Sequence, residues 1–180
     1  MTGFVMIIAM LIATVLQVYL PGHPMLGSAR CPLLLAVVLY YALCRPREAM
    51  AVAAFFCGVL LDTTSGIPLG FSCVCFLIIG AFASRCRSLV LAEAAITQAF
   101  FGATAAFLLH VVQFVYLSST GVIAVSLGTG LLKATGAAML GGLVTPLVFV
   151  LMRVVDANVG VVLRRNDVDE RFGGDFGQSA

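Results

Sequence analysis

The sequence predicts an all-α integral membrane protein, a bundle of about six transmembrane helices with both termini on the cytoplasmic side (N-in/C-in). Hydrophobic residues make up 62% of the 180 residues, and charged residues only 10%. Soluble domains are about half apolar and about a quarter charged, so lipid must be the solvent for much of this surface. Six apolar runs and an uneven distribution of Arg and Lys predict the number and direction of the helices.

The apolar runs, separated by Pro, Gly and Arg residues, predict each helix in order. We expect helices at residues 4–20, 32–44, 49–61, 69–83, 89–117 and 131–152. The first run lacks a basic segment before it and a cleavage site after it, so it is expected to be a retained helix and not a signal peptide. A span needs about 20 apolar residues. The second, third and fourth helices are therefore short, and the fifth is long enough to tilt.

Positive charges predict the orientation of the bundle. With the N-terminus inside, the outer segments hold only Arg30 and Lys133, and the inner segments hold Arg45, Arg47, Arg85, Arg87, Arg153, Arg164, Arg165 and Arg171. Because Lys and Arg accumulate in cytoplasmic loops, this division of eight to two favours N-in and C-in. Two termini on the same side require an even number of helices, which agrees with six.

The chain is predicted to have two parts, a transmembrane domain at residues 1–152 and a cytoplasmic tail at residues 153–180. The tail holds four Arg and five acidic residues, which leaves a net charge of −1. Val155, Val159, Val162 and Leu163 recur at helical spacing, so the first half of the tail is expected to lie on the membrane surface. The glycine-rich stretch 172–177 is expected to be disordered.

No motif in the sequence predicts catalysis, a metal site or a cofactor. Ser72 and His110 can be written as a nucleophile and a base, but Gly-x-Ser-x-Gly, His-Glu-x-x-His and a phosphate-binding loop are absent. The six cysteines lie in or beside apolar runs, where they are expected to pack as small hydrophobic residues. A net charge of +2 with scattered basic residues does not predict nucleic-acid binding. We therefore expect a protein that is not an enzyme.

Asp62 is the clearest ionisable residue between two apolar runs, where such a group is costly unless it has a partner or a function. Gly66 suits the end of one helix and Pro68 the first turn of the next, so the chain is expected to break there. Two interpretations remain open. Either Asp62 caps the turn at the outer interface, or the broken helix pair forms a binding site, as it often does in transporters.

The fifth and sixth helices carry signs of close helix–helix contact. Gln98, His110 and Gln113 interrupt the apolar stretch of the fifth helix, and His110 and Gln113 share a helix face. We expect an interhelical hydrogen bond there, with a proton relay or a ligand contact as the alternative. Small residues predict close packing against a neighbouring helix, in the same chain or in a partner, at Ala99, Gly102, Ala103, Ala106, Ala134, Ala138 and Gly142.

Three motifs resemble those of the rod shape-determining protein MreD family. They are a helix with aromatic residues that ends in Arg45-Pro46, the sequence Gly58-Val59-Leu60-Leu61-Asp62, and the sequence Gly66-Ile67-Pro68-Leu69-Gly70. The resemblance covers residues 1–155 and implies a non-enzymatic, multi-pass protein of the bacterial inner membrane that belongs to the cell-elongation machinery. The partner-binding residues are then expected to be Asp62, Gly66, Pro68, Gly70, Arg45 and Pro46.

The resemblance also implies the partners. These are a single-span membrane protein of the MreC type and, through it, MreB filaments, RodZ and the RodA/penicillin-binding-protein synthase of peptidoglycan, with membrane lipid around the helices. The family also resembles the substrate-binding subunits of energy-coupling-factor vitamin transporters in overall fold. Such a small-molecule-binding subunit is the alternative function, but it should present several polar and aromatic side chains to its ligand, and this chain offers few polar ones.

Overall fold

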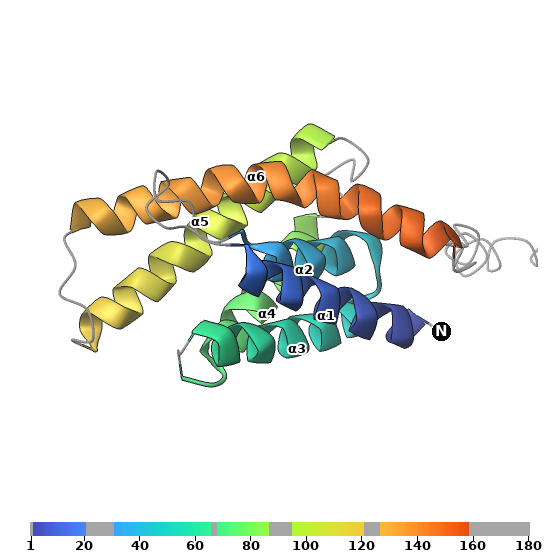
Figure 1. The fold of residues 1–180 in the computed structure, drawn as a ribbon, viewed down its shortest axis with the longest axis horizontal. Coiled ribbons are helices and arrows are strands. Elements are labelled where there is room, and N and C mark those ends of the chain that lie inside the picture. Colours follow the sequence, from blue (N-terminus) through green and yellow to red (C-terminus); the bar gives the residue numbers. More distant parts are fainter. Residues whose placement is uncertain (1, 21–30, 66–67, 87–94, 121–126, 159–180) are drawn as a thin grey trace, which may run out of the picture.

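The computed structural model describes residues 2–20, 31–65, 68–86, 95–120 and 127–158, and these residues form six α-helices without a strand. Figure 1 shows the helices in chain order: α1 (Thr2–Tyr19), α2 (Leu33–Cys44), α3 (Arg47–Ser65), α4 (Phe71–Cys86), α5 (Ala95–Ser119) and α6 (Leu127–Asn158). The all-α prediction is confirmed, and each predicted helix has its counterpart.

The helix ends differ from the predicted ends because apolar content does not determine where a helix stops. Helix α3 continues past residue 61 to Ser65, and the Thr63 and Thr64 hydroxyls bond the Leu60 carbonyl oxygen at 2.9 and 3.0 Å. Helix α6 starts four residues before residue 131 and ends six residues after residue 152, at Asn158. The predicted start of the fifth helix at residue 89 and the tail from residue 159 lie outside the described residues.

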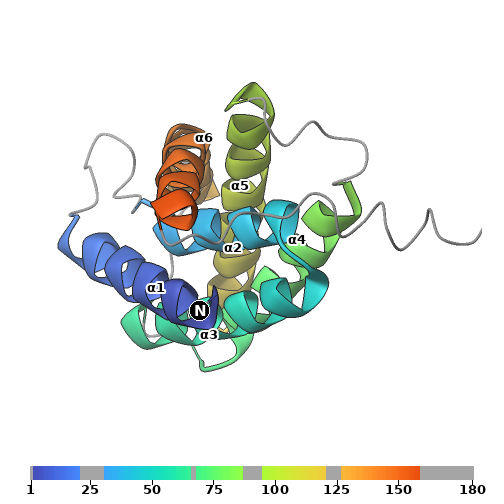
Figure 2. The same cartoon turned by 90° about the vertical axis from the view of Figure 1, so that its right-hand side faces the viewer.

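Helix α2 lies at the centre of the bundle, as the view along the molecule in Figure 2 shows. All of its residues from Leu33 to Leu43 are buried, and it contacts α1, α3, α4, α5 and α6. A helix that is hydrophobic all round is typical of such an enclosed position. Because neighbouring helices cover its sides, α2 does not need the length of a helix that faces lipid.

Two antiparallel helix pairs are packed closely enough to exclude side chains larger than hydrogen. In the α3–α4 pair, a Cβ atom built on Gly58 would lie 2.4 Å from the Cα atom of Cys73. In the α5–α6 pair, a Cβ atom on Gly102 would lie 2.0 Å from the Thr145 Oγ1 atom. The predicted close packing of α5 against α6 is confirmed at Gly102 and Gly142, since Gly142 also lies against Ala99 and Ala103.

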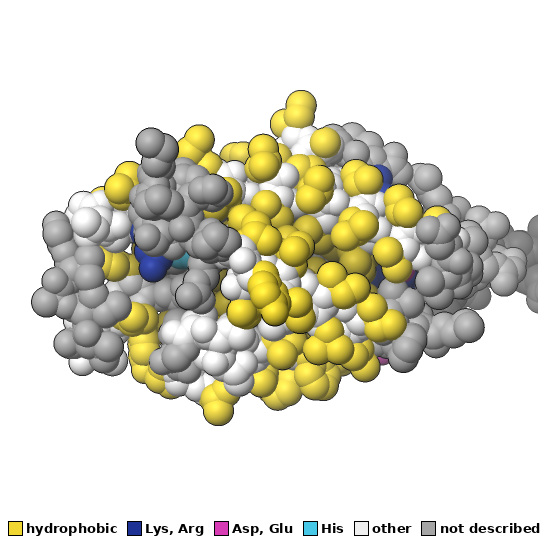
Figure 3. Space-filling view, viewed as in Figure 1, with side chains coloured by type: hydrophobic (Ala, Val, Ile, Leu, Met, Phe, Trp, Pro, Cys, Tyr) yellow, Lys and Arg dark blue, Asp and Glu magenta, His cyan; other side chains and the backbone are white. Residues whose placement is uncertain are grey.

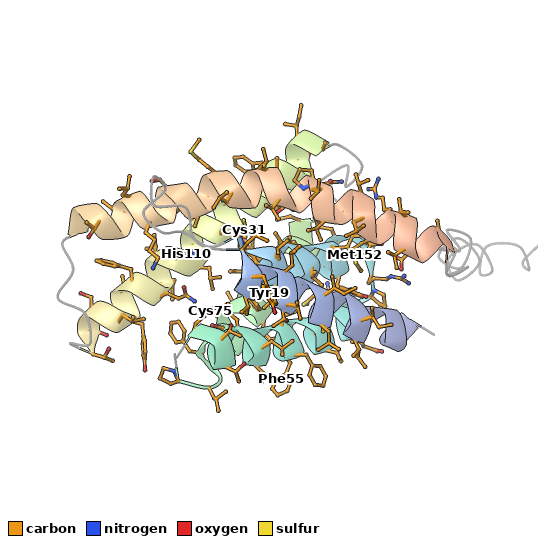
Figure 4. The ribbon with its side chains drawn as sticks, in the orientation of Figure 1. Tyr19, Cys31, Phe55, Cys75, His110 and Met152 are labelled. Atoms are coloured by element: carbon orange, nitrogen blue, oxygen red, sulfur yellow. The ribbon has the colours of Figure 1, made fainter. Side chains whose placement is uncertain are left out.

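The outer surface of the bundle is mostly apolar, as the space-filling view in Figure 3 shows for one face. Phe55 points away from α3 (Figure 4) and is 52% exposed, and Leu143 on α6 is 76% exposed. Three helical segments are long and apolar enough to cross a membrane, namely Arg47–Ser65, Ala95–Ser119 and Gly128–Ala157, and the other three helices are shorter. The described residues therefore include three helices that are long and apolar enough to span a membrane.

Candidate functional site

The carboxylate of Asp62 closes the start of helix α4. Asp62 is in the last turn of α3 and is 1% exposed. Its Oδ2 atom accepts a hydrogen bond from the Gly70 amide at 2.7 Å, and its Oδ1 atom accepts one from the Ser72 amide at 3.1 Å. The first amides of a helix have no acceptor within the helix, so Asp62 acts as a side-chain cap supplied by the preceding helix. Both carboxylate oxygens are thus engaged inside the chain.

The turn before α4 is shaped by Gly70 and leaves two residues outside the bundle. Gly70 has φ of 102°, in the left-handed region that favours glycine, and the Phe71 amide donates to the Pro68 carbonyl oxygen at 3.3 Å. Pro68 is exposed, and Leu69 is 72% exposed. The predicted site residue Gly66 lies outside the described residues. The described part of the turn therefore presents an apolar tip on a backbone that Asp62 holds in place.

Arg45, also predicted as a partner-binding residue, lies in a second polar cluster. Its Nη2 atom is 2.9 Å from the Asp156 Oδ2 atom, and the two side chains are 9% and 8% exposed. The Tyr40 hydroxyl donates to the same oxygen at 2.5 Å, and the Tyr40 ring packs edge-on against Phe149 with centroids 5.3 Å apart. This buried cluster joins the end of α2 to the end of α6.

The predicted site residues therefore fall into two groups at opposite ends of α3. Arg45 and the exposed Pro46 come just before the first residue of α3, and Asp62 is in its last turn. Seventeen residues from Arg45 to Asp62 correspond to roughly 25 Å along a helix. One small ligand cannot contact both groups.

The structure contains two buried polar contacts that the sequence analysis does not predict, one made by Gln17 and one by Asp156. The buried Gln17 side chain on α1 accepts a hydrogen bond from the Leu34 amide at 3.1 Å, so it caps α2 as Asp62 caps α4. Asp156 was assigned to the tail, although Phe149, Met152 and Asp156 follow the spacing of one helix face. That spacing was the available signal. The sequence carries no signal for the partners of Asp156, since Tyr40 and Arg45 are more than 100 residues away in the chain.

The predicted hydrogen bond between His110 or Gln113 and a neighbouring helix is wrong for the described residues. The His110 Nδ1 atom bonds the carbonyl oxygen of Ala106 in its own helix at 2.9 Å, and Gln113 makes no hydrogen bond to a described residue. Packing of small residues holds α5 to α6 instead.

The residues considered for chemistry are not assembled into a reactive site. The Ser72 Oγ atom is buried without a hydrogen-bond partner in the described structure, so His110 does not activate it as a base would. Within the described ranges, no three His, Cys, Asp or Glu side chains are grouped to hold a metal ion.

Comparison with known proteins gives one family. The family model described as rod shape-determining protein MreD matches residues 1–155. That range includes Asp62, Gly70 and Arg45, and it ends one residue before Asp156. No curated protein and no solved structure matches the chain.

Proposed function

Because the chain belongs to the rod shape-determining protein MreD family, we propose that it serves as a multi-pass component of the bacterial cytoplasmic membrane that takes part in cell elongation without catalysing a reaction. Membership supports a role as a rod-shape-determining membrane protein, in a family of structural proteins. The proposal adds three points to that role, namely the membrane topology, the partner and the surface that binds the partner.

The proposed topology has six transmembrane helices with both termini in the cytoplasm. Figure 1 supports it, because the start of α1, the connection from α2 to α3 and the end of α6 lie at one end of the molecule. Helix α2 has 12 residues, or about 18 Å, less than the roughly 30 Å hydrocarbon core. Its burial among the other helices accounts for this shortness, since protein and not lipid surrounds its ends.

The proposed binding surface for an MreC-type single-span protein is the turn that Asp62 holds. The observation that carries this proposal is that Leu69 is 72% exposed on a turn whose amides are fixed by a buried carboxylate. A fixed turn binds with a smaller loss of conformational entropy than a mobile one. Leu69 and Pro68 would make the contact, and Asp62, Gly66 and Gly70 would position them.

Arg45 and Pro46 take an indirect part in the proposal. The Arg45–Asp156 ion pair fixes the end of α6, from which the proposed cytoplasmic tail continues. Through the MreC-type partner, the protein would connect with MreB filaments, RodZ and the RodA/penicillin-binding-protein synthase, and so support peptidoglycan synthesis.

The observed contacts favour this proposal over a vitamin-transporter subunit. Transporters often use free helix N-termini to hold anionic groups of the substrate. Here the start of α4 is capped by Asp62 and the start of α2 by Gln17. Bulky side chains also fill the centre of the bundle, with Tyr40, Tyr41 and Phe76 fully buried.

The test replaces the exposed leucine of the turn. Leu69→Gln should lower co-purification of the MreC-type partner about tenfold, because burying a leucine side chain contributes about 1.5–3 kcal/mol and 1.4 kcal/mol is tenfold in affinity. The measurement is partner recovered from detergent extracts, normalised to the amount of each variant.

Leu131→Gln is the matched control, because Leu131 is also exposed (56%) and lies near the start of α6. Its partner recovery should stay within about twofold of the wild type. Equal partner recovery for the two variants would overturn the proposed surface. If cells with either variant also keep their normal shape, the turn is not required for the function of the protein.

A further inference from the structure

Three polar side chains on α5 and α6 keep hydrogen-bonding or charged groups that no described residue engages. The His110 Nδ1 atom donates to the Ala106 carbonyl oxygen at 2.9 Å, which leaves the Nε2 atom free. Gln113 is half-buried and makes no hydrogen bond to a described residue. Lys133 is exposed and forms no ion pair with a described carboxylate. Polar groups in a membrane are costly without partners, and such residues commonly mark functional sites.

The packing of α5 against α6 places these side chains at the same height along the helix pair. Gly130 on α6 lies against the Phe114 ring, and Gly141 lies against Ala106. Lys133 comes between these two glycines, so it is level with the turn of α5 that holds His110 and Gln113. Figure 3 shows a cationic side chain beside a histidine at this end of the molecule.

In the proposed six-span topology, the cluster would lie at the depth of lipid headgroups and upper acyl chains. Lys133 is six residues after Leu127, where α6 begins, and Gln113 is six residues before Ser119, where α5 ends. Six residues correspond to roughly 9 Å along a helix. Around the cluster the surface is apolar, because Val112 is 44% exposed and Leu132 is 54% exposed. Figure 4 shows His110 where α5 passes α6 in that view.

We propose that the seam of α5 and α6 at His110, Gln113 and Lys133 is a binding site for the phosphate of an anionic membrane lipid. The Lys133 ammonium and the Gln113 amide would donate to phosphate oxygens, and the His110 Nε2 atom would border the same space. The lipid chains would cover the neighbouring Val112 and Leu132. A phospholipid such as phosphatidylglycerol and a polyprenyl phosphate share this chemistry.

The experiment measures lipid retained by the full chain after purification, using native mass spectrometry. Phosphatidylglycerol, phosphatidylcholine, a polyprenyl phosphate and inorganic phosphate are titrated separately. Wild type should bind the two anionic lipids more tightly than phosphatidylcholine. Lys133→Gln should weaken that binding about fivefold, since one basic residue near an anionic lipid surface contributes about 1 kcal/mol. Lys133→Arg keeps the charge and should retain most of the binding.

Two further variants that leave the net charge unchanged distinguish a specific binding site from general charge attraction. Gln113→Leu should also weaken binding. Thr135→Leu should not, because the exposed Thr135 hydroxyl bonds carbonyl oxygens of its own helix. Unchanged binding in both Lys133→Gln and Gln113→Leu would overturn the site, as would equal affinity for phosphatidylcholine or binding of inorganic phosphate alone. Tighter binding of the polyprenyl phosphate than of phosphatidylglycerol would support the site and identify a lipid carrier as its ligand.

Discussion

Asp62 and Gln17 perform the same task on two successive helix pairs. Each lies near the end of one helix and supplies an oxygen to an amide at the start of the next, Asp62 for α4 and Gln17 for α2. An unbonded amide is costly where water is excluded. Since Leu34 and Ser72, which donate these amides, are buried, a side chain takes the place of water. The carboxylate makes the stronger contact because its hydrogen bonds are charge-assisted.

At Asp62 this reasoning gives a prediction for stability. Asp62→Leu should lower the free energy of unfolding by about 1–3 kcal/mol, the usual cost of leaving a buried polar group unsatisfied. Asp62→Asn should cost less, because its single carbonyl oxygen still serves one amide. The measurement is thermal unfolding in detergent, with Thr63→Val as control because the Thr63 side chain is exposed. An Asp62→Leu protein that unfolds at the same temperature as the wild type would contradict the capping role of Asp62.

Among helices, the joint between α2 and α6 depends on a buried ion pair. The α5–α6 pair meets the rest of the bundle largely through α2, and the Tyr40–Phe149 ring contact lies close to the Arg45–Asp156 pair. Removing one member of such a pair leaves an uncompensated charge in a buried place. The pair therefore fixes how the two helices meet at this end, whatever its net contribution to stability.

The prediction for this joint uses a double-mutant cycle. Asp156→Asn should destabilise the protein by about 3–5 kcal/mol, because it leaves the Arg45 charge buried. Adding Arg45→Gln should recover part of that loss, since the double variant holds no buried charge. Thermal unfolding in detergent measures all four proteins, and the exposed Glu48→Gln serves as control. Additive effects of the two substitutions would show that the side chains are not coupled.

The contrast between Asp62 and Asp156 shows what the sequence can predict. Asp62 was found because it interrupts an apolar run just before Gly66 and Pro68, which is a local signal. The Asp156 contacts depend on how α6 packs against α2, and no local pattern reports that packing. The end of α3 differs from the predicted end for a related reason, since the helix continues through a polar stretch to Ser65 that apolar periodicity does not report.

For the whole molecule, the surface and the charges together favour one orientation in the membrane. Exposed apolar side chains such as Phe82, Met139 and Leu147 surround the bundle. Arg45, Arg47 and Arg153 lie at the ends of helices that meet at one end of the molecule. Lys133 is near the start of α6, toward the opposite end. Lipid would therefore cover the middle, with most positive charge on the cytoplasmic side.

The topology prediction follows from this arrangement and from the eight-to-two division of basic residues. Fusions after Arg47, Arg87 and Arg165 should be fluorescent with a reporter that folds in the cytoplasm, and fusions near Gly27 and Thr120 should be active with a phosphatase that works outside it. Each site is tested with both reporters, so that poor expression is not read as location. Thr120 is the decisive position, because it directly follows α5 and its side of the membrane depends on every preceding span. A cytoplasmic signal there, with the other four sites as expected, would mean that α5 does not cross, and the six-span bundle would have to be abandoned.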